Sequence, residues 1–224
     1  MMILNIAMDG PVGAGKSTIA TAVAKRLGIL HLDTGAMYRA LGLSAIRAGI
    51  DINDEAAITA HALRTDVSVA HSGDGQRTFA DGEDVTDLIR TQEISAAASK
   101  VGTYQGVRRH MVAIQQKLAA STPMLVDGRD ICLRVLPDAP VKIFLTASDE
   151  ERARRRWADM VKKDSTVQYE DVLRDLRARD AQDMNRQVDP LRPTPDAVIV
   201  DSTDMDFAQV VDYIIRVVEE KMHE

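Results

Sequence analysis

The sequence predicts an α/β protein with a five-stranded parallel sheet flanked by helices, a small antiparallel β insert and a helical lid. Five short apolar runs alternate with helical patterns along most of the 224 residues. A complete glycine-rich phosphate loop lies between the first run and the first helix. With 45% hydrophobic residues the chain can build one core, so residues 1–224 are predicted to form a single domain.

The apolar runs have the length and composition of buried strands. They are Met2–Met8, Ile29–Asp33, Met124–Asp127, Val141–Leu145 and Ala197–Asp201. The segments with helical spacing are Ser17–Leu27, Ala36–Ala48, Tyr104–Ala120, Glu150–Val161, Val167–Asn185 and Phe207–Lys221. Strands that alternate with helices form parallel sheets, so we expect ligands at the carboxyl ends of the strands.

Two regions interrupt this alternation. In residues 64–90, the segments Asp66–Ala70 and Gln76–Ala80 alternate polar and apolar residues, which predicts a small antiparallel lobe. Ser148–Glu151 resembles a capping box that begins a helix. The next arginines, at 152, 155 and 156, stand at i, i+3 and i+4 on one face of it. A break at residues 164–167 then suggests a lid over phosphates, although a solvated basic face is the alternative.

Residues 10–17 match the P-loop pattern G-x-x-x-x-G-K-[ST] in the strand–loop–helix context that the motif requires. Its backbone N–H groups and the helix N-terminus face a β-phosphate. Lys16 would add a charge at the β/γ-phosphates, and the Ser17 hydroxyl would bind Mg²⁺. The predicted nucleotide-binding residues are Gly10, Pro11, Val12, Gly13, Ala14, Gly15, Lys16, Ser17 and Thr18.

Composition excludes several other classes of protein. A net charge of −6 argues against a general nucleic-acid surface. The single cysteine, Cys132, excludes an internal disulfide and a cysteine-rich zinc site, and fits a reducing cytoplasm. We find no signal peptide and no transmembrane run. We therefore expect a cytoplasmic monomer with no nucleic-acid or membrane partner.

Arginines follow two of the predicted strands. Asp33-Thr-Gly-Ala-Met-Tyr-Arg39 comes after one strand, and Asp127-Gly-Arg-Asp130 comes after another. Both arginines should therefore lie near the phosphate loop. Later in the chain, Arg179, Asp183 and Arg186 stand at i, i+4 and i+7 on one helical face. Such an arrangement could hold a second phosphate, but on its own it could also be a surface ion-pair pattern.

Six motifs together resemble the bacterial cytidylate kinase family. In order they are Gly-Pro-Val-Gly-Ala-Gly-Lys, Leu-Asp-Thr-Gly-Ala-Met-Tyr-Arg, Ile-Arg-Thr-Gln-Glu, Asp-Gly-Arg-Asp, Pro-Asp-Ala-Pro-Val-Lys-Ile-Phe-Leu and Arg-Asp-x-x-Asp-x-Asn-Arg. The resemblance implies a P-loop kinase fold and ATP-dependent phosphorylation of CMP and dCMP to CDP and dCDP, with Mg²⁺ bound with ATP. It also implies that residues 36–100 are a monophosphate-binding insert and residues 149–168 a lid.

The resemblance assigns roles to individual residues of this chain. The residues implied in catalysis are Lys16, Arg129, Arg152, Arg155 and Arg156. Those implied in CMP binding are Thr34, Arg39, Ser99, Arg108, Arg129, Asp130, Arg179, Asp183 and Arg186. Within that set, the arginines at 39, 129 and 186 would hold the acceptor phosphate, and the residues at 179 and 183 would contact the sugar. The remaining residues at 99, 108 and 130 would read cytosine, whose amine donates and whose carbonyl and ring nitrogen accept.

One segment departs from the family pattern. Where the family continues Ile-Gly-Thr-Val-Val, this chain has Ile131-Cys132-Leu133-Arg134-Val135. If the glycine allows a close approach to the ligand, Cys132 should narrow the pocket; a packed core cysteine is the alternative. The preference among CMP, dCMP and UMP also stays open.

Two other functions remain open. A kinase for a hydroxyl acceptor would need a general base, and Asp33 is the candidate. A nucleotide-sensing switch would need no second phosphate clamp, which argues against it.

Overall fold

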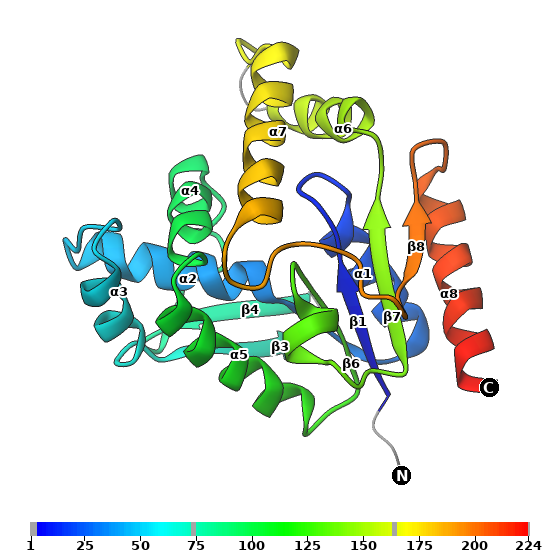
Figure 1. Cartoon of the computed structure of the whole chain (residues 1–224), viewed down its shortest axis with the longest axis horizontal. Helices are drawn as coiled ribbons and strands as arrows, with labels where there is room; N and C mark the ends of the chain where they lie inside the picture. The colour runs from blue at the N-terminus through cyan, green and yellow to red at the C-terminus, as the bar shows by residue number, and fades with distance from the viewer. Residues whose placement is uncertain (1–3, 73–74, 163–164, 224) are drawn as a thin grey trace.

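A computed structural model describes residues 4–72, 75–162 and 165–223 of the chain. Its centre is a five-stranded parallel sheet with the strand order β2-β6-β1-β7-β8 (Figure 1). The strands are β1 (Asn5–Asp9), β2 (Leu30–Asp33), β6 (Met124–Gly128), β7 (Val141–Thr146) and β8 (Val198–Asp201). The five predicted strands and their parallel pairing are confirmed; residues 2–3 of the first predicted strand lie outside the described residues.

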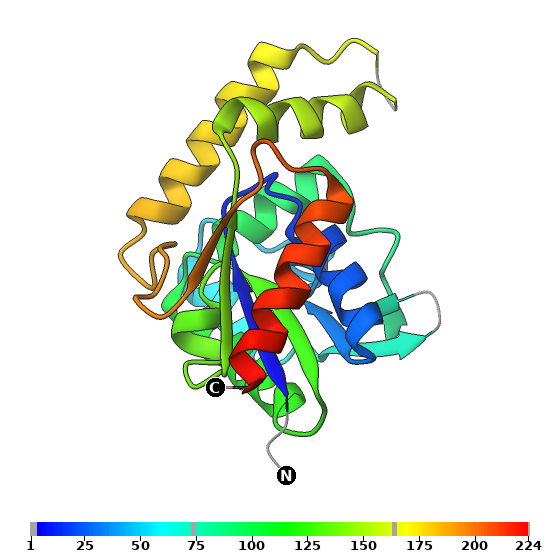
Figure 2. The same ribbon diagram turned by 90° about the vertical axis from the view of Figure 1, so that its right-hand side faces the viewer.

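Helices cover both faces of the sheet at its central strands β1, β6 and β7, which explains why these strands are buried and largely apolar. Alternate residues of β1 point to opposite sides: Ala7 joins one core, and Ile6 and Met8 join the other. The second core is closed by α1 (Lys16–Leu27) and α8 (Phe207–His223), which lie side by side in Figure 2. None of the described helices combines the length and apolarity needed to cross a bilayer.

The first core is closed by the segment between β2 and β6. Its elements are α2 (Thr34–Arg47), α3 (Glu55–Ala62), β3 (Val67–Ser72), β4 (Gly75–Ala80), β5 (Glu83–Asp84), α4 (Gln92–Val101) and α5 (Gln105–Ala119). The predicted antiparallel lobe is confirmed as the sheet β3-β4-β5. The helices α3 and α4 were not predicted. Both are short; α3 also lacks a clear periodicity, whereas α4 has a periodic apolar stripe that the sequence reasoning overlooked.

The small sheet meets the outer edge of the large one through side chains. Gln76 of β4 accepts from the Asp33 N–H at 2.8 Å and donates to the Asp33 carbonyl at 3.2 Å. Its amide thereby takes the place of a neighbouring strand at the end of β2. Asp33 also caps α2 by accepting from the Ala36 N–H at 2.9 Å, so the small sheet is tied to the start of that helix.

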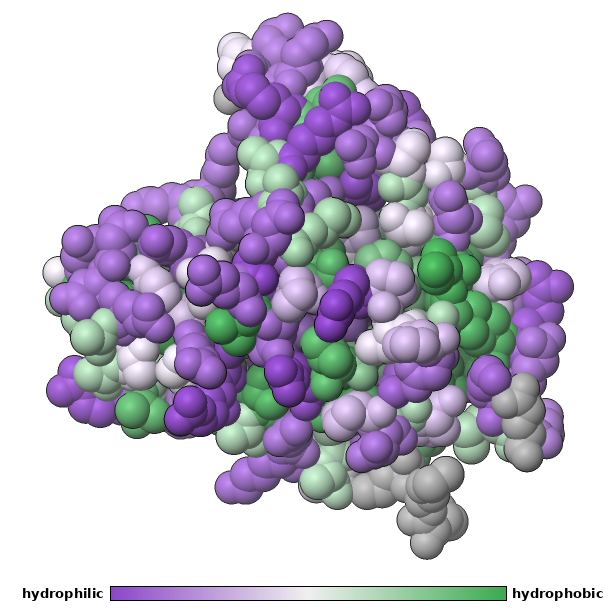
Figure 3. All heavy atoms as spheres, viewed as in Figure 1, coloured by the Kyte–Doolittle hydropathy of each residue, from purple (hydrophilic) through white to green (hydrophobic). Residues whose placement is uncertain are grey.

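A pair of helices, α6 (Asp149–Val161) and α7 (Tyr169–Asn185), rises above the carboxyl end of the sheet (Figures 1 and 2). The predicted cap is confirmed, because Ser148 accepts from the Glu151 N–H at 3.3 Å. The indole of Trp157 donates to the Val167 carbonyl at 3.0 Å and thereby joins the two helices. In Figure 3 this lobe has a hydrophilic surface, whereas hydrophobic residues gather near β8, where Ile199 is 58% exposed.

Candidate functional site

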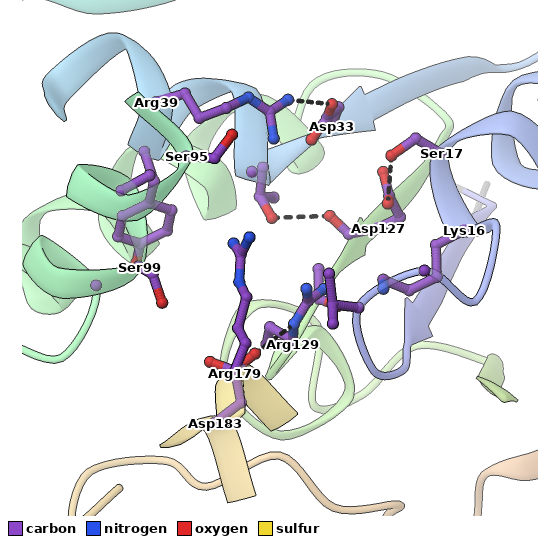
Figure 4. A pocket seen from close by; sticks show the side chains of 18 of the residues that line it. Lys16, Ser17, Asp33, Arg39, Ser95, Ser99, Asp127, Arg129, Arg179 and Asp183 are labelled. Atoms are coloured by element: carbon purple, nitrogen blue, oxygen red, sulfur yellow. Dashed lines mark hydrogen bonds and ion pairs between the residues drawn. The ribbon is translucent and has the colours of Figure 1, made fainter. Parts of the chain in front are cut away.

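A cleft of about 340 Å³ opens at the carboxyl end of the sheet, where parallel sheets place their ligands. The loop before α1 lines one side of it, α2 and α4 another, and α7 closes the far side. All nine predicted CMP-binding residues line this cleft, and so do six predicted residues of the phosphate loop, whereas Gly10, Pro11 and Ala14 do not. Figure 4 shows Lys16 and Ser17 on one side of this space, with Arg39, Arg129 and Arg179 pointing into it.

The phosphate loop has the tight conformation that its glycines allow. Gly15 caps α1 with φ 84°, a left-handed conformation that other residues rarely adopt. A Cβ on Gly10 would lie 2.0 Å from the carbonyl oxygen of Leu145, so no larger residue fits there. The Lys16 ammonium folds back onto this loop and donates to the Pro11 carbonyl at 2.8 Å. Burial, and then the positive charge of Arg129, lower the pKa of Lys16 to about 7.

An oxygen-rich corner lies beside the loop. The Ser17 hydroxyl donates to Asp127 Oδ2 at 3.0 Å, and His31 Nε2 lies 2.7 Å from Asp127 Oδ1. Thr34, at the start of α2, donates to the Asp127 carbonyl at 2.7 Å. A hydroxyl and a carboxylate are the hard oxygen ligands that Mg²⁺ prefers. The described residues hold no group of three metal-ligating side chains, so such an ion would need further oxygens from a bound phosphate.

Arginines crowd the opposite side of the cleft. Arg129 donates to Asp183 at 2.9 Å and Arg39 donates to Asp33 at 2.9 Å. Burial, and then the charge of Arg129, lower the pKa of Arg179 to about 10. Buried nitrogens of Arg39, Arg179 and Arg186 have no hydrogen-bond partner among the described residues. Buried donors normally have hydrogen-bond partners, and the positive charges of these arginines repel one another. The arrangement therefore favours the binding of an anion.

The three residues assigned to the base also line this cleft, although they come from different elements. Arg108 of α5 contacts Asp130, which follows β6. Ser99 of α4 accepts from Gln182 of α7 at 3.3 Å, across the cleft. A carboxylate acceptor, a guanidinium donor and a hydroxyl are thus brought together beside the arginines.

The predicted arginine face of the lid needs correction. Arg152 is 3% exposed and donates to the Val12 carbonyl at 2.7 Å and to Asp180 at 2.5 Å. Arg155 donates to the Ser202 carbonyl at 2.6 Å, and of the three arginines only Arg156 lines the cleft. These arginines share one face of α6, but that face contacts the phosphate loop and α7 at one point and the residues after β8 at another. Arg152 therefore holds the phosphate loop rather than reaching into the cleft.

The structure does not support the prediction that Cys132 narrows the pocket. Its side chain is 3% exposed, lies 3.9 Å from the Ile143 carbonyl, and does not line the cleft. Burial raises the pKa of the thiol, which disfavours a reactive thiolate. Cys132 belongs to a π-helix, η1 (Ile131–Val135), whose first N–H groups donate to the buried Asp9 at 2.8 and 2.9 Å.

Sequence reasoning missed two carboxylates. Asp180 of α7 accepts from the Val12 N–H at 3.1 Å and from Arg152, so it joins the phosphate loop to α7, the helix that closes the far side of the cleft. Its position between Arg179 and Asp183 in the motif was the available signal. Asp189 accepts from Arg108 and Arg134, and no pattern in the sequence marks it.

Comparisons with known proteins agree with this geometry. The family model for cytidylate kinase matches residues 6–220. A cytidylate kinase of Desulfitobacterium hafniense is 45% identical over 98% of this chain and 94% of its own length. That of Mycolicibacterium paratuberculosis is 46% identical over 96% of this chain and 95% of its own. A solved structure of an uncharacterised protein from Eubacterium ventriosum, at 11% identity, shares the fold with a TM-score of 0.52 over 96% of this chain and 98% of its own.

Proposed function

The chain belongs to the cytidylate kinase family, and on this premise we propose that it transfers the γ-phosphoryl group of ATP to the phosphate of CMP or dCMP. The observation that carries the proposal is the combination, in one cleft, of a phosphate loop with buried arginine nitrogens that have no hydrogen-bond partner among the described residues. One phosphate group would lie on the loop, and the second would lie among the arginines. A kinase whose acceptor is itself a phosphate needs both positions.

The chemistry then depends on position and charge. An oxygen of the acceptor phosphate bonds to the γ-phosphorus as the bond from the γ-phosphorus to the bridging oxygen breaks, and ADP leaves. No strong base is needed, because the attacking oxygen already carries charge. Lys16 would neutralise charge on the transferring group, while Arg39, Arg129 and Arg186 would hold the acceptor. Bound Mg²⁺ would supply further charge neutralisation, held by Ser17 and Asp127 together with phosphate oxygens.

A second pocket, of about 830 Å³, is where we propose that the nucleoside of the donor binds. It adjoins the first cleft at the phosphate loop and runs between α6 and the start of α8. Arg155 and Arg156 line it, so they could act on the donor from the lid. We also propose that residues 36–100 form the monophosphate-binding insert and that residues 149–168 form the lid.

The geometry disfavours the two alternative functions. Both oxygens of the Asp33 carboxylate already have partners, because Oδ1 caps α2 and Oδ2 pairs with Arg39, which disfavours a second role at a hydroxyl acceptor. A switch without an acceptor would leave buried nitrogens of Arg39, Arg179 and Arg186 without a hydrogen-bond partner among the described residues. ADP release should be measured with ATP and a panel of nucleoside monophosphates. We expect rapid release with CMP and dCMP, whereas slow release that is indifferent to the monophosphate would contradict the proposal.

Nucleotide binding should take up a proton near pH 8. Lys16 has a pKa of about 7 in the ligand-free protein, so it is largely neutral at that pH. A bound triphosphate favours the charged ammonium and raises the pKa again, so about one proton should be taken up per site. The uptake should vanish at pH 6, where Lys16 is already protonated. Calorimetry in buffers of different ionisation enthalpy measures it, and Lys16→Met should abolish it.

Asp183 should support ribose and deoxyribose alike. Its carboxylate already accepts from Arg129 and keeps lone pairs for one sugar hydroxyl. If that hydroxyl is the 3′-OH, kcat/KM for CMP and dCMP should agree within about tenfold, whereas 3′-deoxy-CMP should be poor. Asp183→Ala should weaken both natural acceptors together and leave ATP binding unchanged. A wild-type preference for CMP over dCMP of about a hundredfold or more would show that the 2′-OH is required.

A further inference from the structure

Asp189 lies in the turn after α7 and has an unusual backbone for an aspartate. Its φ is +49°, in the left-handed region that Asn and Asp tolerate better than most other residues. Arg186 Nε donates to its carbonyl at 2.6 Å, and the Leu191 N–H donates to the Asp183 carbonyl at 2.9 Å. The turn is thus folded back onto the end of α7, and the position of Asp189 is fixed.

The Asp189 carboxylate is shared by two arginines. Its side chain is 8% exposed, with Oδ2 3.2 Å from Arg108 Nε and Oδ1 accepting from Arg134 Nε. Neither Asp189 nor Arg134 lines the cleft, whereas Arg108 does. The carboxylate therefore acts on the site from behind Arg108.

This contact limits how Arg108 can meet Asp130. Arg108 Nε is taken by Asp189, and Nη1 donates to the Gly102 carbonyl at 3.2 Å. Only Nη2 then reaches Asp130, at Oδ2. A two-pronged pairing that covers both oxygens of Asp130 would need Nε or Nη1 as its second donor, and each of these already has a partner in Asp189 or Gly102. The other oxygen, Oδ1, lies 3.6 Å from Arg186 Nη2, beyond hydrogen-bond distance, and so can accept from a ligand.

We propose that Asp189 is a positioning residue for base selection, which keeps one oxygen of Asp130 open for the amine of cytosine. This inference rests on the proposed function, because it concerns the base site of the same cleft. Cytosine presents an amine donor where uracil presents a carbonyl acceptor. An open carboxylate oxygen favours the amine and repels the carbonyl. If Arg108 turned to cover both oxygens of Asp130, that distinction would be lost.

Arg134 completes the arrangement from the surface. Its side chain is 56% exposed, and it holds the Asp189 oxygen that faces away from Arg108. With both oxygens held, the plane of the carboxylate is fixed. Arg134 belongs to the segment that departs from the family pattern, so the departure acquires a role here: it orients Asp189 and does not reshape the pocket.

The test compares kcat/KM for CMP and for UMP. Asp189→Asn keeps the tolerance for a left-handed backbone but removes the charge, and should lower the CMP-to-UMP ratio about tenfold, mostly through CMP. Arg134→Gln should lower the same ratio about threefold, although this side chain is remote from the cleft. Arg26→Gln is the control and should change nothing, because Arg26 is about as exposed as Arg134 but pairs with Asp212 on the surface, away from the cleft.

The double variant Asp189→Asn/Arg134→Gln separates positioning from general stability. If Arg134 acts through Asp189, the second substitution adds nothing to the first. Equal losses for CMP and UMP, additive effects, or an unchanged ratio in both single variants would overturn the role of Asp189. Arg134→Lys should restore part of the ratio. A wild-type enzyme that uses CMP and UMP equally would overturn this inference, whereas one that phosphorylates neither would contradict the proposed function itself.

Discussion

Replacing Lys16 with alanine should lower kcat by about 10²–10³, because one preorganised charge on a transferring phosphoryl group is worth that much. Folding should be unaffected. The ammonium is 7% exposed and burial depresses its pKa, so the folded protein gains no stability from its charge. Initial rates with saturating ATP and CMP measure the effect, and urea unfolding checks the fold.

Lys25→Ala is the control for this change. Lys25 lies on the same helix, in its exposed last turn, and away from the cleft. The substitution Lys25→Ala removes a lysine, as Lys16→Ala does, and should leave kcat unchanged. Turnover at the wild-type level in Lys16→Ala would contradict the role of the phosphate loop in phosphoryl transfer.

Replacing Arg152 with methionine should destabilise the fold by about 3 kcal/mol, because removing one partner of a buried ion pair leaves the other charge uncompensated. That other charge is Asp180, whose side chain is 8% exposed. The substitution also removes the donor to the Val12 carbonyl, so the phosphate loop loses its support. The free energy of unfolding in urea measures the effect.

The matched control is Arg154→Met, on the same helix. Arg154 is 63% exposed and pairs with Glu151 on the surface, so its loss should matter little. Stability at the wild-type level in Arg152→Met, together with lost turnover, would contradict this account. It would return Arg152 to the catalytic role that the sequence predicts.

The sheet and the phosphate loop could be predicted because their causes are local. The apolar run of β1, the glycines of the loop and the start of α1 follow one another directly in the sequence. The left-handed conformation at Gly15, with φ 84°, is one that glycine adopts readily. The helix α3 escaped prediction because its short, alanine-rich sequence has little periodicity, whereas α4 was overlooked although its apolar stripe is periodic. The grouping of Arg108, Asp130 and Ser99 came from the family resemblance, since the residues lie far apart in the chain.

The true partners of the lid arginines could not be read from spacing. Helical periodicity says which side chains share a face, but Arg152 meets Asp180 only because α7 folds back beside the phosphate loop. The partners of Asp189 are equally hidden: 81 positions separate it from Arg108 and 55 from Arg134. Cys132 shows the same limit, because a family comparison suggested a pocket residue where the fold supplies a core position.

The helix α7 serves both halves of the cleft at once. Asp180 fastens it to the phosphate loop, and Asp183, three residues later and about 4.5 Å along the axis, faces the acceptor side. A rotation of α7 that improves one contact must alter the other, so the two binding events share a free energy of coupling. Thermodynamic linkage makes such coupling reciprocal: by whatever factor CMP changes the affinity for ATP, ATP must change the affinity for CMP.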